Sequence, residues 1–493
     1  MSCQESKRPR RQTPDPKPQP LPPRMLSQSF PPSRRDFLRN AAVAGAALGA
    51  ASPQRLLAQV AGDRPARGAG LTVLNPQERV PVSFIIDDST CLVNLNKFAM
   101  PQFDAAFGGG NKTYHRDWRS WPDEIPDAFV RKFGEWCATH GVKGKYSIVP
   151  YPACVGRLDG ELPGWSPKDV AASLDLVREV MVPNWDIHPE MVTHTRVIDL
   201  KTGHPVPERS LKFMENWEWT TGRSADEIAD YLRYALTILK NVGLPCEGVT
   251  TPGGFGTRAL PQLAQASLAA LRDVYRAEIP HYFRHLYDSG SESVAPRVEY
   301  ASGLDGPDPR CVVSIIACTG DWTGGWDNTP PEGVDKFITA DLQSGRLVEV
   351  IERGEPACLL AHWTGIWWNG EEKGFKIFQE VHRRIHQRFD HLIWMKLAEI
   401  SRYWAARELT RLERVGNAVR ISAPFACPGF TLRIDGPIPG TPRFAARPGN
   451  PAPELREVDS ARALKPGTWR RDRQGGIVVC WDLARQPTEL SLQ

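Results

Sequence analysis

Short apolar segments alternate with longer segments of helical periodicity along most of the chain. Such apolar runs are typical of strands that are buried on both faces of a parallel sheet. Two of the helical segments begin with clear start signals, because Ser166 precedes a proline and Ser224 forms a capping box with Glu227. The predicted strands are 80–87, 145–151, 185–191, 248–252, 311–319 and 358–364, and the predicted helices are 126–139, one from 166, 224–243, 260–276 and 375–388.

Repeated strand–helix units predict an α/β fold in which helices cover a parallel sheet. No GxGxxG or Walker motif follows the first strand, which counts against a nucleotide-binding sheet. The segment 75–410 is long enough for a (β/α) barrel with long loops, and in such folds the chemistry lies where strands end and loops begin. We therefore expect the functional residues among the polar side chains at strand ends.

The pattern changes near residue 410. Residues 390–409 predict one long amphipathic helix, after which β-like segments are separated by turns rich in glycine and proline. These segments predict a small β domain over 412–493. It either packs on the barrel or is a carbohydrate-binding module.

The first 59 residues differ in composition from the rest of the chain. Residues 1–33 hold nine prolines and almost no apolar periodicity, which predicts disorder. The segment 1–59 carries 10 Lys or Arg and 3 Asp or Glu, so the remainder has a formal charge of −3 although the whole chain carries +4. A body without net positive charge argues against a nucleic-acid-binding protein.

Residues 33–39, Ser-Arg-Arg-Asp-Phe-Leu-Arg, resemble the twin-arginine (Tat) export motif. The uncharged Ala/Gly/Val/Leu run at 41–51 follows it and is too short to span a membrane. We therefore expect the chain to use the Tat translocase, to keep no stable transmembrane anchor and to be periplasmic or secreted. Met1 and Met25 both remain open as the start of translation.

The first predicted strand ends in two adjacent carboxylates, Asp87 and Asp88. Burying such a pair is costly unless the carboxylates are paired with other groups or bind a cation. Beside a metal ion, one of them can ligate while the other stays free as a base. The alternative is that they form an ordinary turn or helix cap.

His188 and His194 lie six residues apart around the end of the third predicted strand, with Asp186 and Glu190 close by. Imidazole and carboxylate groups together suit zinc and similar divalent ions. We therefore predict a divalent metal ion, with zinc as the first expectation, held by Asp88, His188 and His194.

The chain contains 16 tryptophans, several of which follow predicted strands. Flat aromatic rings stack on the C–H faces of sugars, so tryptophans clustered in such loops predict a carbohydrate cleft. Trp322, Trp363 and Trp367 are the expected substrate-binding residues. The alternative is that these tryptophans pack the loops onto the barrel.

Four short motifs at strand ends resemble the polysaccharide deacetylase family, whose members are metal-dependent carbohydrate esterases on a distorted (β/α) barrel. The resemblance covers about residues 80–370. The motifs, in chain order, are Asp-Asp at 87–88, His-Thr at 194–195, Asp-Trp at 321–322 and Leu-x-x-His at 359–362.

The resemblance implies a role for each matching residue. Asp87 would be the general base, and His362 the general acid that protonates the leaving sugar oxygen. Asp88 and His194 would bind the metal, while Asp321 and Thr251 would support the site. A divalent ion would polarise an acetyl carbonyl and its bound water.

Two features depart from the family pattern. The family's second histidine falls four residues after the first, where this chain has Ile198, and His188 is our substitute for it. The family's Arg-x-Pro stretch is replaced by Thr-Thr-Pro-Gly at 250–253, so the arginine that would hold the base is absent.

The sequence leaves three functions open. The first is an exported, metal-dependent hydrolase that acts on carbohydrate, with deacetylation as its expected reaction. The second is a glycoside hydrolase that uses paired carboxylates in the same cleft, drawn from Asp87 or Asp88 with Asp321 or Glu190. The third is a carbohydrate-binding pseudoenzyme.

Overall fold

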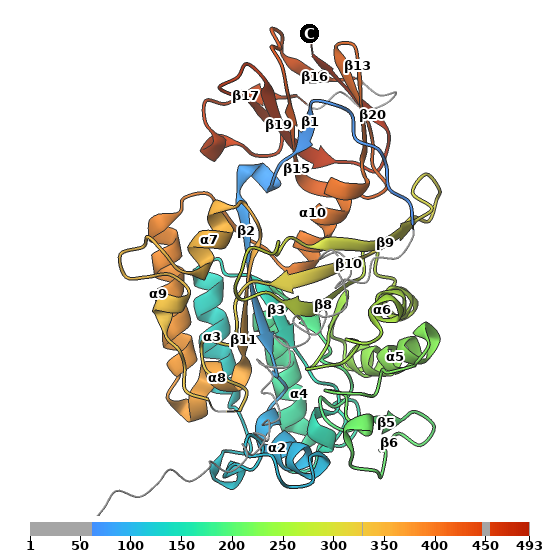
Figure 1. Ribbon diagram of the computed structural model, residues 1–493, viewed down its shortest axis with the longest axis vertical. Helices are drawn as coiled ribbons and strands as arrows, with labels where there is room; N and C mark the ends of the chain where they lie inside the picture. The colour runs from blue at the N-terminus through green and yellow to red at the C-terminus, as the bar shows by residue number, and fades with distance from the viewer. Residues whose placement is uncertain (1–61, 328, 446–453, 493) are drawn as a thin grey trace, which may run out of the picture.

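The computed structural model describes residues 62–327, 329–445 and 454–492 (Figure 1). The predicted leader, with its Tat motif and both candidate start residues, lies outside these ranges. Within them, no helix has the length and apolar character needed to cross a lipid bilayer.

One parallel sheet contains the first predicted strands. Its order is β11 (Ala357–His362), β2 (Val80–Asp87), β3 (Gly144–Ser147) and β4 (Trp185–His188), and β12 (Leu392–Trp394) pairs with the start of β2. Every residue of β2 is buried, as its continuous apolar run requires.

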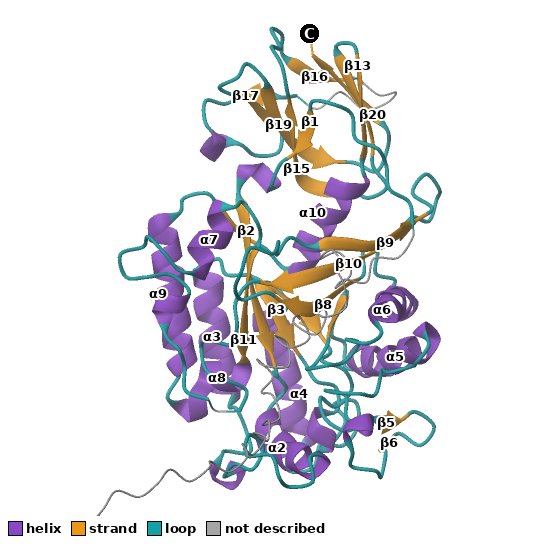
Figure 2. Cartoon of the chain, viewed as in Figure 1, coloured by secondary structure: helices purple, strands orange, loops and turns teal. Residues whose placement is uncertain are grey.

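Helices cover the outer face of this sheet. Phe84 of β2 stacks on Phe378 of α9 (Lys373–Arg388) with ring centroids 4.0 Å apart, and it also contacts Phe133 of α3 (Asp127–Thr139). Figure 2 shows these helices on the outside of the strands. The layered arrangement follows from the apolar faces of both helices.

A second sheet continues the alternation. Its order is β7 (Gly248–Thr250), β8 (His281–Leu286), β10 (Arg310–Ala317) and β9 (Arg297–Ser302), of which the first three strands are parallel. The helices α5 (Ala225–Asn241) and α6 (Leu260–Tyr275) lie beside it, and α5 begins with the predicted capping box between Ser224 and Glu227.

The two sheets meet at both of their parallel edges. At one edge, Glu190 and Thr250 form an isolated parallel bridge, and at the other the Cys318 N–H donates to the Cys358 carbonyl at 2.8 Å. The described strands therefore form a mixed α/β core of two adjoining sheets, without one continuous closed ladder among them.

The long helix predicted for 390–409 is divided in the structure. Residues 392–394 are β12, and α10 (Leu397–Leu409) begins after them. The reason is that the edge of β2 offers free backbone groups, and the Met395 N–H donates to the Val82 carbonyl at 2.9 Å. The segment before the helix is therefore held as a strand.

The C-terminal part contains two antiparallel-rich sheets, one of which also includes β1 (Leu71–Val73). Its hydrophobic core is continuous with that of the α/β part, because Phe430 and Trp481 belong to the same buried cluster as Leu360 and Tyr403 of α10. This continuity favours the packing role over a separate carbohydrate-binding module. The strands are β13 (Arg411–Val415), β14 (Ala418–Ser422), β15 (Cys427–Ile434), β16 (Pro442–Phe444), β17 (Arg456–Glu457), β18 (Thr468–Arg471), β19 (Ile477–Leu483) and β20 (Thr488–Leu492).

Candidate active site and metal centres

Asp88, Glu190 and His194 converge at the carboxyl ends of β2 and β4, and we call them the strand-end group. His194 Nε2 lies 2.7 Å from Asp88 Oδ1 and 3.3 Å from Glu190 Oε1. All three side chains are buried. The structure thus brings together Asp88 and His194, as the sequence predicts, and adds Glu190.

The local backbone aims these side chains at one point. Asp88 and His194 both adopt left-handed conformations, with φ of 62° and 64°, which turn the chain sharply after each strand. Glu190 Oε2 accepts the Asp88 N–H at 2.8 Å and the Ser147 hydroxyl at 3.1 Å. One carboxylate therefore ties the ends of three neighbouring strands together.

Glu215 fixes the loop that carries His194. Its carboxylate accepts the backbone N–H groups of Thr193 at 3.1 Å and His194 at 2.6 Å, and it also accepts the hydroxyl of Tyr231. Burial raises the pKa of Glu215 to about 7 against the opposing effect of these hydrogen bonds. The sequence analysis missed Glu215, because it lies in an irregular segment without a recognisable motif.

The electrostatics of the strand-end group are those of a tight ion cluster. Burial by itself would lower the pKa of His194, but the charges of Asp88 and Glu190 override it and raise this pKa to about 10. Burial works against the charged carboxylates too, yet the histidines lower the pKa of Asp88, and His194 lowers that of Glu190. Two carboxylates thus face one imidazolium.

The donor atoms of the strand-end group fit a divalent cation. One nitrogen and two carboxylate oxygens lie within 4.8 Å of one another. Among the described residues, the Asp88 oxygens and Glu190 Oε1 have only His194 and His362 as polar partners. Buried carboxylates whose polar partners are imidazole nitrogens are suited to coordinate a metal ion together with those nitrogens.

His362 and Asp321 form a second pair beside this group. His362 ends β11 in register with Asp87, and its Nδ1 lies 2.9 Å from Asp321 Oδ2. The opposite nitrogen, Nε2, lies 3.9 Å from Asp88 Oδ2. A carboxylate on Nδ1 fixes the orientation of the ring and leaves Nε2 directed at the strand-end group.

Asp87 is held by a lysine that the sequence analysis did not single out. Lys145 of β3 is fully buried, and its Nζ lies 2.5 Å from Asp87 Oδ1 and 2.6 Å from Ser147 Oγ. Lys145 thus supplies a cation to Asp87 in a chain without the family's arginine at 250–253. A charged residue within a buried strand was the available signal.

The residue at the position of the family's second histidine lies outside the strand-end group. Ile198, in β5 (Ile198–Asp199), is buried in an apolar cluster with Leu232 and Tyr231. Glu190 therefore occupies the place in the donor set that the sequence analysis gave to His188.

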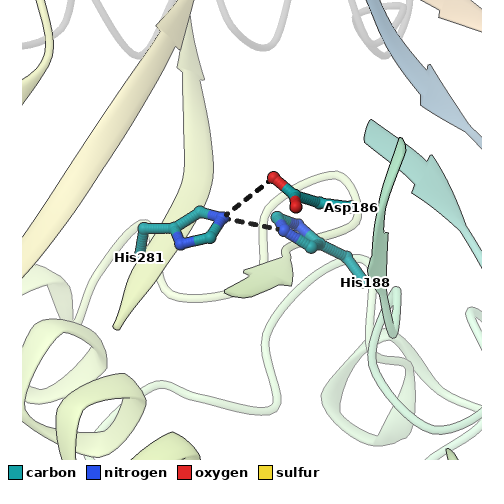
Figure 3. Close-up of side chains that lie close together, drawn as sticks. All are labelled: Asp186, His188 and His281. Atoms are coloured by element: carbon teal, nitrogen blue, oxygen red, sulfur yellow. Dashed lines mark hydrogen bonds and ion pairs between the residues drawn. The ribbon is translucent and has the colours of Figure 1, made fainter. Parts of the chain in front are cut away.

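His188 lies in a different group and precedes Glu190 by two residues, one repeat of the strand's alternation. Asp186, His188 and Glu190 are alternate residues, so all three face the same side of β4 and its extension. His188 Nε2 lies 3.0 Å from Nε2 of His281 in β8, and Asp186 is adjacent (Figure 3). We call Asp186, His188 and His281 the interior group.

Two cavities open beside the strand-end group. The larger, of about 320 Å³, is lined by His362, Asp321, Trp322 and Thr251. The smaller, of about 190 Å³, includes His194. Gly253 and Trp326 line both cavities, so the two adjoin.

The predicted substrate-binding tryptophans differ in whether they line a cavity. Trp322 lines the larger cavity, although it is 5% exposed and belongs to the same buried cluster as the other two. Trp363 is 1% exposed and packs against Phe129 and Phe133, and Trp367 is 7% exposed. Trp363 and Trp367 line neither of the two cavities, which favours the packing alternative for them. Other aromatic residues line the smaller cavity, namely Phe103, Phe107, Tyr114, Trp217 and Trp326.

Comparisons with known proteins give distant matches. No family model matches the sequence. No curated protein matches it. The chain is similar in structure to a probable polysaccharide deacetylase from Pseudomonas aeruginosa PAO1, with a TM-score of 0.36, 11% identity and coverage of 67% of this chain and 91% of that one.

Two further matches are to other carbohydrate-active enzymes. A 4-alpha-glucanotransferase from Thermococcus litoralis aligns with a TM-score of 0.34, 13% identity and coverage of 66% of this chain and 40% of that one. An alpha-fucosidase from Thermotoga maritima aligns with a TM-score of 0.26, 11% identity and coverage of 85% and 97%.

Proposed function

We propose that this chain is an exported, metal-dependent hydrolase of carbohydrate esters, and that its reaction is deacetylation. The proposal includes a distorted (β/α) barrel of the polysaccharide-deacetylase type, in which the two adjoining sheets are its halves. It also includes export through the Tat translocase to the periplasm or beyond. The geometry of the site supports the proposed reaction. The motif at 33–39 supports the proposed export.

One observation carries the proposed reaction. The strand-end group brings two carboxylates and one imidazole together, and its Asp88 Oδ2 lies 3.9 Å from Nε2 of His362. Asp321 orients His362, which also lines the larger cavity. A metal-binding triad beside an oriented acid–base group is the minimum that ester hydrolysis by a metal-dependent enzyme requires.

Asp88, Glu190 and His194 would hold the metal ion. When bound, a divalent ion of the zinc type supplies Lewis-acid polarisation of an ester carbonyl and lowers the pKa of water. Glu215 keeps His194 in place through the backbone of its loop. The bridge between Glu190 and the Asp88 N–H keeps the two carboxylates at a fixed separation.

His362 is the proposed general acid. Asp321 stabilises the protonated imidazole from the Nδ1 side, which leaves the Nε2 proton directed at the strand-end group. Transfer of that proton to the sugar oxygen allows the alcohol to leave as a neutral group. Because His362 also lines the larger cavity, the leaving sugar would occupy that space.

Asp87 is the proposed general base, and Lys145 is its positioning residue. The lysine ammonium orients the Asp87 carboxylate through Oδ1 and is itself anchored by the Ile86 carbonyl at 2.9 Å. This arrangement replaces the arginine of the family pattern with a lysine from β3.

The larger cavity suits a polar, ring-shaped substrate. Trp322 and Trp326 offer aromatic faces, while Asp288, Asp327 and Arg284 offer hydrogen-bonding groups. This mixture of flat apolar and polar surfaces is typical of carbohydrate sites. A volume of about 320 Å³ accommodates one or two sugar rings.

The test is product analysis with the metal-loaded enzyme. Acetylated chito- and xylo-oligosaccharides should release acetate with no shortening of the chain, and a chelator should abolish the release until Zn²⁺ is restored. Shorter chains without acetate would replace the proposal with glycoside cleavage. Bound oligosaccharide without either product would replace it with a carbohydrate-binding protein.

A further inference from the structure

The interior group lies outside the reaction proposed above, and its donor atoms form a site of their own. We propose that Asp186, His188 and His281 bind a second divalent metal ion of the zinc type. The ion would lie inside the strand core, toward the amino ends of the strands, and would join β4 of one sheet to β8 of the other. The proposal stands whether or not the strand-end group is catalytic.

The geometry of the interior group fits three ligands around one ion. His188 Nε2 and His281 Nε2 lie 3.0 Å apart, and Asp186 Oδ2 lies 4.0 Å from His281 Nε2. Figure 3 shows both imidazoles and the carboxylate directed at the space between them. Two imidazoles and one carboxylate are a common ligand set for zinc, with a fourth position left for water.

The outer contacts of the ligands match those of metal sites. His188 Nδ1 lies 3.3 Å from Thr250 Oγ1, so the hydroxyl holds the ring with Nε2 facing His281. Asp186 Oδ2 accepts the N–H of Ala398, in the first turn of α10, at 2.6 Å. Such contacts orient ligands and are typical of metal sites.

Gly248 keeps the space beside the two imidazoles open. A Cβ atom at this position would lie 2.4 Å from both Nε2 atoms. Every residue other than glycine would therefore push the imidazoles apart. The backbone of β7 thus approaches the two nitrogens at the point where they face each other.

The interior group can exchange an ion with solvent. Asp186 lines a cavity of about 650 Å³ that lies between the amino ends of β3, β4 and β7 and the start of α10. Its side chain is 13% exposed, whereas His281 is fully buried. This cavity lies at the opposite end of the strands from the two that adjoin the strand-end group.

Burial lowers the pKa of His281 to about 4, and it lowers the pKa of His188 as well. The competing explanation is a plain N–H···N hydrogen bond between the two rings, which the same 3.0 Å separation allows.

The experiment is metal analysis of the full chain, loaded with Zn²⁺ and freed of excess metal. Each group is disabled separately, by Asp88→Asn for the strand-end group and by Asp186→Asn or His281→Gln for the interior group. We expect the wild type to retain two molar equivalents and each of these variants to lose one. His285→Gln is the matched control, since His285 is another histidine of β8, half-buried and outside both groups, and it should retain both equivalents.

The outcome that overturns the proposal is equal metal content in wild type, Asp186→Asn and His281→Gln, which leaves the hydrogen bond as the explanation. Two variants at two ligands guard against misfolding of one, and circular dichroism verifies the fold of each. Co²⁺ in Asp88→Asn gives an independent readout. Visible d–d absorption that disappears in Asp88→Asn/Asp186→Asn supports the interior site, and its absence from Asp88→Asn refutes it.

The two proposals fail separately. Equal metal content in wild type, Asp186→Asn and His281→Gln, with acetate release retained, overturns the second metal site and leaves the proposed function intact. Absence of any esterase activity, with one equivalent lost in Asp186→Asn, leaves the second metal site intact.

Discussion

The strand-end group and the interior group each take one or more members from β4 and the residues just after it, but they solve the problem of burial differently. Glu190 belongs to the first, and His188 and Asp186 belong to the second. The strand-end group combines two carboxylates with an imidazolium, so its charges are partly neutralised without a metal. The interior group has one carboxylate and two neutral rings, with no cation among its own members.

A bound ion would therefore change different things at the two places. At the strand-end group, Asp88, Glu190 and His194 would hold the ion in place of the proton of His194. At the interior group, coordination would take the place of the imidazole–imidazole contact. The first exchange is suited to reversible chemistry, and the second to strengthening a seam at which the two sheets share few backbone hydrogen bonds.

The largest expected effect separates the groups by activity. Asp88→Asn removes one ligand charge from the strand-end group and should lower kcat/KM for acetate release by about 10³-fold or more, the order of effect of lost metal catalysis. Asp305→Asn, an exposed change in a loop, is the control and should leave the rate unchanged. Full activity in Asp88→Asn would end the distinction, because the strand-end group would then have no special role.

Lys145 is the charge that links the two groups. Its ammonium lowers the pKa of both Glu190 and His188, and it pairs with Asp87 in a fully buried position. Lys145→Met should reduce the free energy of unfolding by about 3–5 kcal/mol, because it removes the ammonium that pairs with the buried Asp87 carboxylate.

Denaturant unfolding of the metal-free protein measures this change. Adding Asp87→Asn to Lys145→Met should recover part of the loss, since the unpaired charge is then removed. If the loss of stability in the double variant equals the sum of the losses in the two single variants, the ion pair is not the source of the effect.

The third effect tests whether acid catalysis is separate from metal binding. His362→Ala should lower kcat by about 10²-fold or more, the usual contribution of a positioned acid. Both metal equivalents should remain, because His362 belongs to neither group. Loss of a metal equivalent in this variant would instead assign His362 to the ligands of the strand-end group.

The smallest effect is a difference in pH dependence. The pKa of His194 is raised to about 10, so the metal-free strand-end group is protonated at about pH 8 and must release a proton on binding metal. Its apparent affinity should therefore rise about tenfold per pH unit between about pH 8 and about pH 9.5. Burial raises the pKa of Asp186 to about 7, and that of His281 is about 4, so the interior group has already lost these protons at pH 8.

The affinity of the interior group should accordingly stay level over the same range. Competition with a chromophoric chelator measures both affinities, with His281→Gln reporting the strand-end group and Asp88→Asn the interior group. Parallel slopes for the two variants would contradict the assignment of the proton to His194.

The sequence predicted the elements that are governed by local patterning. The strand 80–87 matches β2 (Val80–Asp87) residue for residue, and the capping box at Ser224 starts α5. The sequence did not reveal β8, because this strand contains Arg284 and His285 and therefore has no continuous apolar run. With β8 unseen, His281 was missed as well.

The site was predicted only in part, because local patterns identify the ends of strands but not how the strands pair. Asp88 and His194 were identified because they follow strands, but choosing Glu190 rather than His188 as the third member required knowledge of strand pairing. Residues 186, 188 and 190 share a face, and their distance from Asp88 depends on the register of β4 against β3. Lys145 and Glu215 act through long-range contacts that no local motif records.

The edge strand β1 has a consequence for how the chain is made. Leu71 pairs with Ile434, so the C-terminal sheet cannot be completed until nearly the whole polypeptide has left the ribosome. The segment just before β2 therefore lacks its partner strand β15 while the intervening residues are synthesised. We expect a chain that ends before β15 to leave the β1 segment exposed to proteases. We also expect a bulky attachment at residue 71 to slow folding more than one at residue 160.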